Sequence, residues 1–133
     1  MTCDLSKVKE RFEKDVFATE TTGIEIVDVG ECYAKCMLYL KPKHLNAMGA
    51  VMGGVIYTLA DFAFAVAANI GTGDNRVVSQ HMSISFLSPA KGNTLIAVAK
   101  CLKAGRRTCL YEITVTDELG TMVAYTTANG FTV

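Results

Sequence analysis

A long apolar segment that follows a pair of glycines constrains this chain more than any other feature. Residues 55–68 carry polar side-chain atoms at three positions only, Tyr57, Thr58 and Asp61. At helical spacing these three side chains share one side, because residues three and four apart are neighbours on a helix. A helix that is apolar almost all round must be covered on several sides by the rest of the fold. We therefore expect a central helix over residues 55–69 with one polar stripe.

The loop before this helix, residues 46–54, contains three glycines and one side-chain amide, that of Asn46. Backbone N–H groups at a helix start lack an intrahelical partner and favour negative charge. Gly53 and Gly54 have no Cβ, so a ligand can approach those N–H groups closely. With the Asp61 carboxylate two turns further along, such a helix start suits acyl transfer to water.

Asp61 also has a purely structural interpretation. A carboxylate in apolar surroundings is costly unless it is paired or hydrogen-bonded, and burial raises its pKa. A core helix whose Asp61 is hydrogen-bonded by a neighbouring strand would explain the residue equally well. Both interpretations stay open at this point.

The composition indicates one globular domain over residues 1–133, because half of the residues are hydrophobic and a fifth are charged. Thirteen basic residues balance thirteen acidic ones, so no basic field favours nucleic acid or an anionic membrane. Residues 51–70 are long enough to span a bilayer. The central Asp61, the polar stripe and the lack of flanking Lys or Arg argue against a membrane span.

The cysteines predict no disulfide framework, because there are five of them at uneven spacing. Cys32 and Cys36 look like a pair, but on a strand they would lie about 13 Å apart, too far for one disulfide or one metal ion. Residues 1–20 contain no continuous apolar run of the kind found in signal peptides. We expect a reduced protein in the cytoplasm.

The remaining pattern predicts an amphipathic helix within residues 1–20 and then strands on both sides of the central helix. The apolar stripe of the first helix would be Leu5, Val8, Phe12 and Val16. Strands are expected at residues 24–29, 32–40, 77–87, 94–103, 110–117 and 121–133. On the strand at 77–87, Ser79 and His81 should face one way and Met82 the other, and the apolar strand at 94–103 should be covered on both faces. Short connections favour antiparallel neighbours, which predicts an α+β fold with a curved antiparallel sheet around one helix.

This arrangement resembles the hotdog fold. Asn46, Gly49, Gly53-Gly54 and Leu59-Ala60-Asp61 resemble the motif of the phenylacetate-degradation branch of acyl-CoA thioesterases. Further matching pieces are Ser79, the stretch Ser83 to Gly92 with its Ser-Pro-Ala-x-Gly sequence, and Asp117 to Gly120. The resemblance covers residues 22–133.

The resemblance implies roles for four residues. The Gly53 N–H and the Asn46 amide would hold the thioester carbonyl oxygen, Asp61 would be the general base or nucleophile, and Ser79 would orient water or the carboxylate. Asn supplies N–H donors and a carboxylate can accept a proton or attack, so the chemistry agrees. No metal or cofactor is implied, since coenzyme A is part of the substrate.

Other residues are candidates for substrate binding. Gly54 and Met52 flank the N–H donor, and Tyr57 either lines an acyl pocket or packs in the core, the simpler interpretation. Lys91, Arg106 and Arg107 either meet the phosphates of coenzyme A or are ordinary turn charges. The resemblance also implies a homodimer, with each site shared between two subunits, that pairs again into a homotetramer.

Met52 departs from the family pattern, which usually has His before the glycine pair. A thioether neither donates a strong hydrogen bond nor titrates. The leading hypothesis is therefore an acyl-CoA thioesterase that tolerates Met52, and the alternative is an acyl-CoA binding protein without turnover. A hotdog dehydratase is a weaker third hypothesis. His44, two positions before Asn46, either reaches the site or, as the simpler interpretation, is an exposed loop residue. His81 is expected to be hydrogen-bonded within the sheet.

Overall fold

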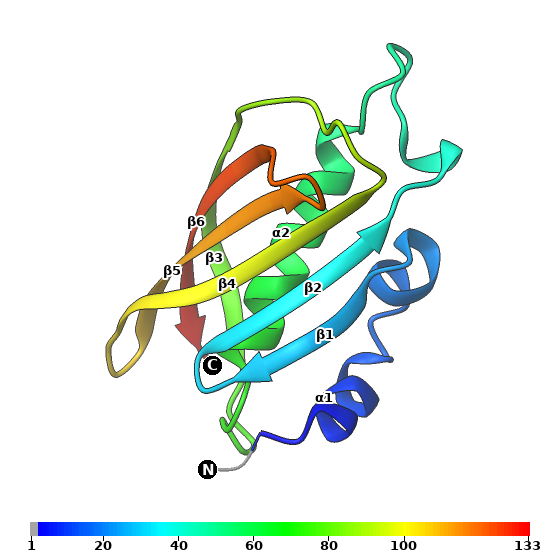
Figure 1. Cartoon of the computed structure of the whole chain (residues 1–133). Coiled ribbons are helices and arrows are strands. Elements are labelled where there is room, and N and C mark those ends of the chain that lie inside the picture. The colour runs from blue at the N-terminus through cyan, green and yellow to red at the C-terminus, as the bar shows by residue number, and fades with distance from the viewer. Residues whose placement is uncertain (1–2) are drawn as a thin grey trace.

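The computed structural model describes residues 3–133, which form one curved sheet around a central helix (Figure 1). The helical elements are α1 (Leu5–Phe12), the π-helix η1 (Phe17–Thr22), the 3-10 helix η2 (Pro42–His44) and α2 (Gly53–Ala68). The strands are β1 (Glu25–Gly30), β2 (Tyr33–Tyr39), β3 (Val77–Phe86), β4 (Thr94–Ala104), β5 (Thr108–Asp117) and β6 (Met122–Thr132). Within residues 3–133, no helix is both long and apolar enough to cross a membrane.

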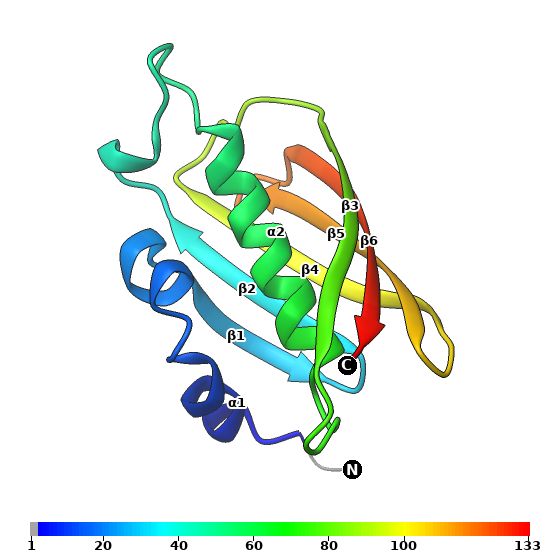
Figure 2. The same cartoon turned by 180° about the vertical axis from the view of Figure 1, so that it is seen from behind.

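The six strands form one antiparallel sheet in the order β1-β2-β4-β5-β6-β3. Helix α2 lies across one face of this sheet, and α1 lies beyond the β1 edge (Figure 2). Strand β3 follows α2 in sequence but pairs only with the last strand, so it forms the opposite edge. The predicted α+β hotdog arrangement is confirmed.

The sheet buries α2 on every side except one. Leu59, Phe62 and Phe64 are at most 2% exposed and face the core. Tyr57, Thr58 and Asp61 keep partial exposure, as the sequence predicts for a polar stripe on a buried helix. The Thr58 hydroxyl donates to the Gly54 carbonyl oxygen at 2.8 Å, so this polar group is satisfied within the helix.

The N-terminal helix is shorter than predicted. Helix α1 ends at Phe12, whose ring meets the Phe62 ring edge-on with centroids 5.8 Å apart. The chain then changes direction before η1, which leaves Val16 50% exposed instead of in the apolar stripe. The packing of Phe12 on α2, and not the apolar periodicity that continues to Val16, therefore determines where the first helix ends. The part of this prediction that concerns Met1 and Thr2 lies outside the described residues.

A β-bulge at Gln80 places Ser79 on the opposite face from the one predicted. Ser79 pairs with Gly130 and His81 pairs with Asn129. Two adjacent residues of β6 therefore lie opposite three residues of β3, and Gln80 is the extra one. A Cβ on Gly130 would touch Phe64 of α2, so Gly130 and its partner Ser79 face the helix. The extra residue reverses the alternation at this point, so Ser79 faces the helix whereas His81 keeps the outward direction.

Strand β4 is covered on both faces only in its first half. Leu95 and Ala97 are fully buried, and Ile96 and Val98 on the outer face are half-buried. The residues after Lys100 are mostly exposed, so the prediction of two covered faces is wrong for that half within a single chain. The reason is that the sheet curves away from α2 towards the β4–β5 turn (Figure 1).

Two carboxylates hold the segment that leads into β4. Asp117 Oδ2 accepts hydrogen bonds from the N–H groups of Lys91 and Gly92 at 2.8 and 3.0 Å. Its Oδ1 accepts from Leu119 and Thr121 at 3.0 and 2.9 Å, which closes the β5–β6 turn. The side chain therefore ties two turns together. Residues 117–120 and the Ser-Pro-Ala-x-Gly stretch, two of the segments that resemble the thioesterase family, are therefore joined to each other by this carboxylate.

Glu118 extends this contact. Its carboxylate oxygens accept hydrogen bonds from the N–H groups of Asn93 and Thr94 at 2.9 to 3.1 Å. A Cβ on Gly92 would overlap Glu118 Oε1, so no larger residue fits there without moving the carboxylate. Together Asp117 and Glu118 fix residues 91–94 through the backbone alone.

The Asp117 contact predicts a pH-dependent loss of stability in Asp117→Asn. Burial opposes ionisation of Asp117, but the N–H groups of Lys91, Thr121 and Gly92 outweigh it and hold the pKa well below its usual range. A lowered folded-state pKa adds stability above the ordinary carboxyl pKa of about 3.9, and that stability is lost as pH falls through the folded value. At pH 7 the variant should unfold several degrees below wild type in a thermal melt. The gap should narrow steadily below about pH 4, and a gap of constant size would contradict this account.

Candidate active site

Helix α2 begins without a cap, which leaves two backbone donors free. Met52 at the N-cap position makes no side-chain hydrogen bond to the helix. The N–H groups of Val55 and Ile56 donate to the Met52 carbonyl oxygen at 3.0 and 3.3 Å. The N–H groups of Gly53 and Gly54 have no acceptor within residues 3–133. Because the helix dipole adds positive potential there, these donors favour an anion or a polarised carbonyl oxygen.

The loop before α2 is shaped by Asn46. Its Oδ1 accepts hydrogen bonds from the N–H groups of Met48 and Ala50 at 2.9 and 3.1 Å. Leu45 and Val51 form an isolated antiparallel bridge at the base of the loop. The Asn46 amide nitrogen makes no hydrogen bond in the part of the chain that is described, so both of its donors remain available to a ligand. One end of the amide thus shapes the loop and the other can bind.

His44 is structural and not part of the site. It is 3% exposed, so the expectation of an exposed loop histidine is wrong. Its Nδ1 accepts from the Lys41 N–H at 3.0 Å, which requires the proton to sit on Nε2, 2.7 Å from the Thr22 carbonyl oxygen. The His44 carbonyl oxygen in turn accepts from the Met52 N–H at 2.9 Å. Both ring nitrogens are occupied, so His44 positions the chain that enters α2.

Asp61 lies half-buried on the open stripe of α2, and its environment fits an acid–base role. Burial raises the pKa of the Asp61 carboxyl, and the negative charge of Asp15 raises it further. The nearby Ser79 side chain works in the opposite direction and lowers it. The expectation that burial raises this pKa is confirmed. Ser79 of β3 therefore lies close to Asp61 of α2, because the bulge at Gln80 turns Ser79 towards the helix.

Asn69 aligns the strand that carries Ser79, and sequence reasoning missed it. Its amide nitrogen donates to the carbonyl oxygens of Ala65 and Val77 at 2.8 and 3.0 Å. Its Oδ1 accepts from the Val77 N–H at 2.8 Å. The end of α2 is thereby fixed to the start of β3, two residues before Ser79. An asparagine directly after an apolar helix was the available signal, because such a residue caps helix ends.

The predicted catalytic residues fall into two groups along α2. Asn46 lies in the loop that precedes α2, opposite Ala50, and Gly53 is the first residue of the helix. Asp61 and Ser79 lie near the middle of α2. Eight residues separate Gly53 from Asp61, which corresponds to about 12 Å along the helix axis. One thioester carbonyl cannot contact both groups at that separation. The two groups of predicted catalytic residues are therefore separated within a single chain.

The candidate substrate-binding residues are spread over the surface. Met52 is 54% exposed, and its Cε lies 3.4 Å from the position that a Gly54 Cβ would take. Tyr57 is 40% exposed in the single chain. Lys91 lies near the start of α2, where its own N–H donates to Asp117.

The two arginines and His81 lie away from Gly53. Arg106 and Arg107 occupy the β4–β5 turn, at the opposite end of the sheet from the start of α2 (Figure 1). The His81 side chain is exposed on the outer face of β3 and makes no hydrogen bond within residues 3–133, which corrects the expectation that the sheet satisfies it. Among the same residues, no cluster of His, Cys, Asp or Glu could hold a metal ion.

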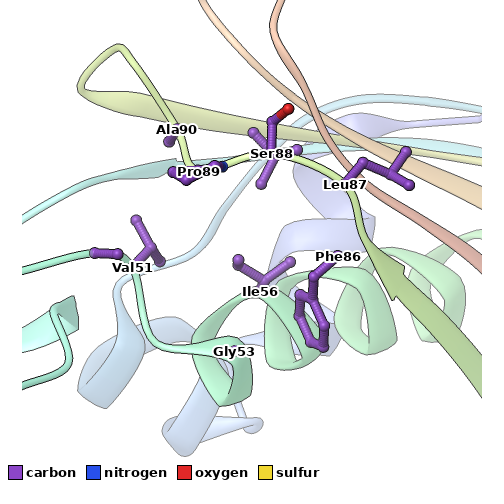
Figure 3. A pocket seen from close by; sticks show the side chains of 10 residues that line it. Val51, Gly53, Ile56, Phe86, Leu87, Ser88, Pro89 and Ala90 are labelled. Carbon is purple, nitrogen blue, oxygen red and sulfur yellow. The ribbon is translucent and has the colours of Figure 1, made fainter. Parts of the chain in front are cut away.

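A hollow of about 250 Å³ opens beside Gly53 (Figure 3). Residues from the loop, from α2 and from the segment after β3 surround it, including Val51, Gly53, Ile56, Phe86, Pro89 and Val123. The Phe86 ring points towards the start of α2, and a Cβ on Gly53 would lie 3.2 Å from its Cζ. The unpartnered Gly53 N–H thus stands next to an apolar cavity. We call this cavity the Gly53 hollow.

Comparison with known proteins establishes the family. Residues 48–124 match the thioesterase superfamily. The chain belongs to this superfamily. A putative esterase of Archaeoglobus fulgidus is 31% identical over 121 residues, which cover 90% of this chain and 77% of that protein. The expectation of a thioesterase is therefore confirmed at the level of the family.

The fold and the named relatives agree with this assignment. The acyl-coenzyme A thioesterase PaaI of Escherichia coli is 32% identical over 85% of this chain and 79% of its own length. The structure of E. coli PaaI superposes with a TM-score of 0.83, covering 98% of this chain and 96% of that one at 25% identity. The protein smu.793 of Streptococcus mutans, solved with acetyl CoA, gives a TM-score of 0.76 at 27% identity, covering 83% and 88% of the two chains.

The raised pKa of Asp61 predicts that Asp61→Asn is more stable than wild type at neutral pH. Near pH 3 the carboxyl is protonated in both the folded and the unfolded state and costs nothing. As pH rises above about 3.9, the unfolded chain releases this proton first, so the stability of wild type falls until the folded-state pKa is passed. Urea unfolding should show the variant more stable at pH 7 and equal to wild type near pH 3. Asp74→Asn, in an exposed loop, is the control, and an Asp61→Asn curve that follows the control would contradict this account.

Proposed function

We propose that this protein hydrolyses acyl-CoA thioesters to a free acid and coenzyme A. The observation that carries the proposal is the pair of unpartnered N–H groups at Gly53 and Gly54, on the same helix as a carboxylate with a raised pKa. The two features supply the two functions that thioester hydrolysis needs, a carbonyl-polarising site and a base. Support comes from the relatives that are named acyl-CoA thioesterases and from a neighbour solved with acetyl CoA.

Two copies of the chain would complete each site. The two groups of predicted catalytic residues, which we call half-sites, lie about 12 Å apart along α2 in one chain, so they cannot meet at one carbonyl. A second α2 running in the opposite direction would bring Asp61 and Ser79 of one copy to Asn46 and Gly53 of the other. The reversal would also bring the β4–β5 turn, with Arg106 and Arg107, to the end where Lys91 lies. These three cations would then share the phosphates of coenzyme A.

The reaction would proceed at the carbonyl carbon of the thioester. The Gly53 N–H and the Asn46 amide would donate to the carbonyl oxygen as it gains negative charge, each donor contributing on the order of 3 kcal/mol to the barrier. Asp61 would accept a proton from water that attacks the carbon, with Ser79 orienting the carboxylate. Alternatively, Asp61 would attack directly and form a mixed anhydride, which water then hydrolyses to the free acid and the carboxylate. Breakage of the C–S bond would release coenzyme A as a thiolate, a leaving group that needs no strong acid.

Met52 is compatible with this reaction. Its exposed side chain lies over Gly54 and occupies neither free N–H group. No step above requires an acid at the position before the glycines. The alternative of a binding protein without turnover therefore gains no support, and the named relatives favour hydrolysis. A homotetramer and a cytoplasmic location remain predictions.

Thiol release from a panel of acyl-CoA thioesters tests the proposed activity. Wild type should hydrolyse at least one chain-length or aryl class, and Asp61→Asn should lower kcat by about 10²- to 10⁴-fold, because it removes the base. Since Asn fills the same space, a folded but inactive variant would isolate the chemical role. Full activity in Asp61→Asn would assign the base elsewhere, and tight acyl-CoA binding without turnover by wild type would favour the binding protein.

Mixing two inactive variants tests whether the site is shared. Asn46→Asp keeps the oxygen that accepts from Met48 and Ala50 but loses the amide donor. In a one-to-one mixture with Asp61→Asn, half of the dimers would contain one intact site out of two. Co-refolding should therefore restore roughly a quarter of wild-type activity.

The matched control combines two changes in the same half-site. Asp61→Asn mixed with Ser79→Ala should give no more activity than the average of the separate variants, because every mixed site lacks one of the two groups. Equal behaviour of the two mixtures would show that the site does not cross between chains.

A further inference from the structure

The Gly53 hollow is apolar in floor and walls. Ile56 and Val123 form its floor and are 5% and 1% exposed. Val51 and Pro89 stand at its sides. Within the described part of the chain, Ser88 is the one lining residue with a polar side chain, and its hydroxyl points away from α2 (Figure 3). No charged group lines the hollow, so its occupant is a hydrocarbon group.

The position of the hollow identifies that occupant. Gly53 forms part of its wall, and the Gly53 N–H has no partner in the described chain. If this N–H holds the carbonyl oxygen of a thioester, the first carbon of the acyl group lies one bond beyond the carbonyl carbon, at the mouth of the hollow. We propose that the Gly53 hollow is the acyl-binding subsite and that Ala90 and Val123 set the size of the acyl group. This inference rests on the proposed function.

The volume of the hollow favours an acyl group of medium size. An apolar cavity of about 150 Å³ is enough to bind a benzene ring. By proportion, the hollow of about 250 Å³ holds roughly six to ten carbons. The substrate class is therefore a thioester with a medium-length chain or a single ring, and a long fatty acyl chain would extend beyond the hollow.

The walls are fixed, so the limit on size follows from packing. The N–H groups of Leu87 and Ser88 both donate to the Val123 carbonyl oxygen, at 2.8 and 3.3 Å. The two residues after Ala90, Lys91 and Gly92, donate hydrogen bonds from their N–H groups to the Asp117 carboxylate. The segment that forms one side of the hollow is thus tied at both ends. A hollow that cannot expand selects by volume.

Two substitutions with opposite effects test the subsite. Ala90→Leu adds bulk at the wall, and Val123→Ala removes it from the floor. Ala104→Leu makes the same change as the first at the exposed end of β4 and is the control. The measurement is kcat/KM of each variant, with acetyl-, hexanoyl-, octanoyl-, dodecanoyl- and benzoyl-CoA. Thermal unfolding of each variant verifies that it is folded.

Ala90→Leu should lower kcat/KM for octanoyl-CoA at least about tenfold relative to acetyl-CoA, since each buried methylene is worth about fourfold in affinity. Val123→Ala should shift the preference towards a longer chain, and Ala104→Leu should keep the wild-type profile. A size profile that is the same in all three variants, while hydrolysis persists, would overturn the subsite and leave the proposed function intact. If wild type hydrolyses none of the five thioesters, the proposed function and the inference fall together.

Discussion

The burial of α2 is the constraint on which the rest of this structure depends. Its sixteen residues are almost entirely apolar, so a sheet must curve round them to remove that surface from water. Curvature leaves one side of the helix uncovered, and the polar residues of α2 lie there. Asp61 and the uncapped start at Gly53 are exposed to a ligand because they are on the side that the sheet does not cover. The location of the candidate site therefore follows from the way the sheet encloses α2.

Several polar contacts outside the catalytic group keep this geometry in place. Asn69 fixes the end of α2 to β3, and Asp117 and Glu118 fix the segment beside the start of α2. His44 supports the chain that enters the helix. Each of these side chains forms hydrogen bonds with backbone groups. Its role is therefore to fix the path of the chain and not to take part in the chemistry. They hold both ends of α2, the helix that carries Gly53 and Asp61.

Sequence periodicity predicted the elements well and the details of β3 poorly. The stripe of Tyr57, Thr58 and Asp61 is decided by helical spacing, which the sequence contains in full. The direction of Ser79 depends on a single extra residue in the pairing with β6, and no local pattern marks it. Likewise, the burial of His44 depends on Thr22, which is distant in sequence. Residues whose role depends on distant backbone partners could not be assigned from their own neighbourhood.

The sequence by itself determined the central helix, its polar stripe, the glycine pair and the antiparallel strands around them. Those features follow from local spacing and from the free energy of burying apolar side chains. Only the tertiary structure decided that Ser79 faces the helix that carries Asp61, that Asp117 joins two turns, and that an apolar hollow adjoins Gly53. These are distances between residues far apart in sequence, and they are set by strand register and by the way side chains pack.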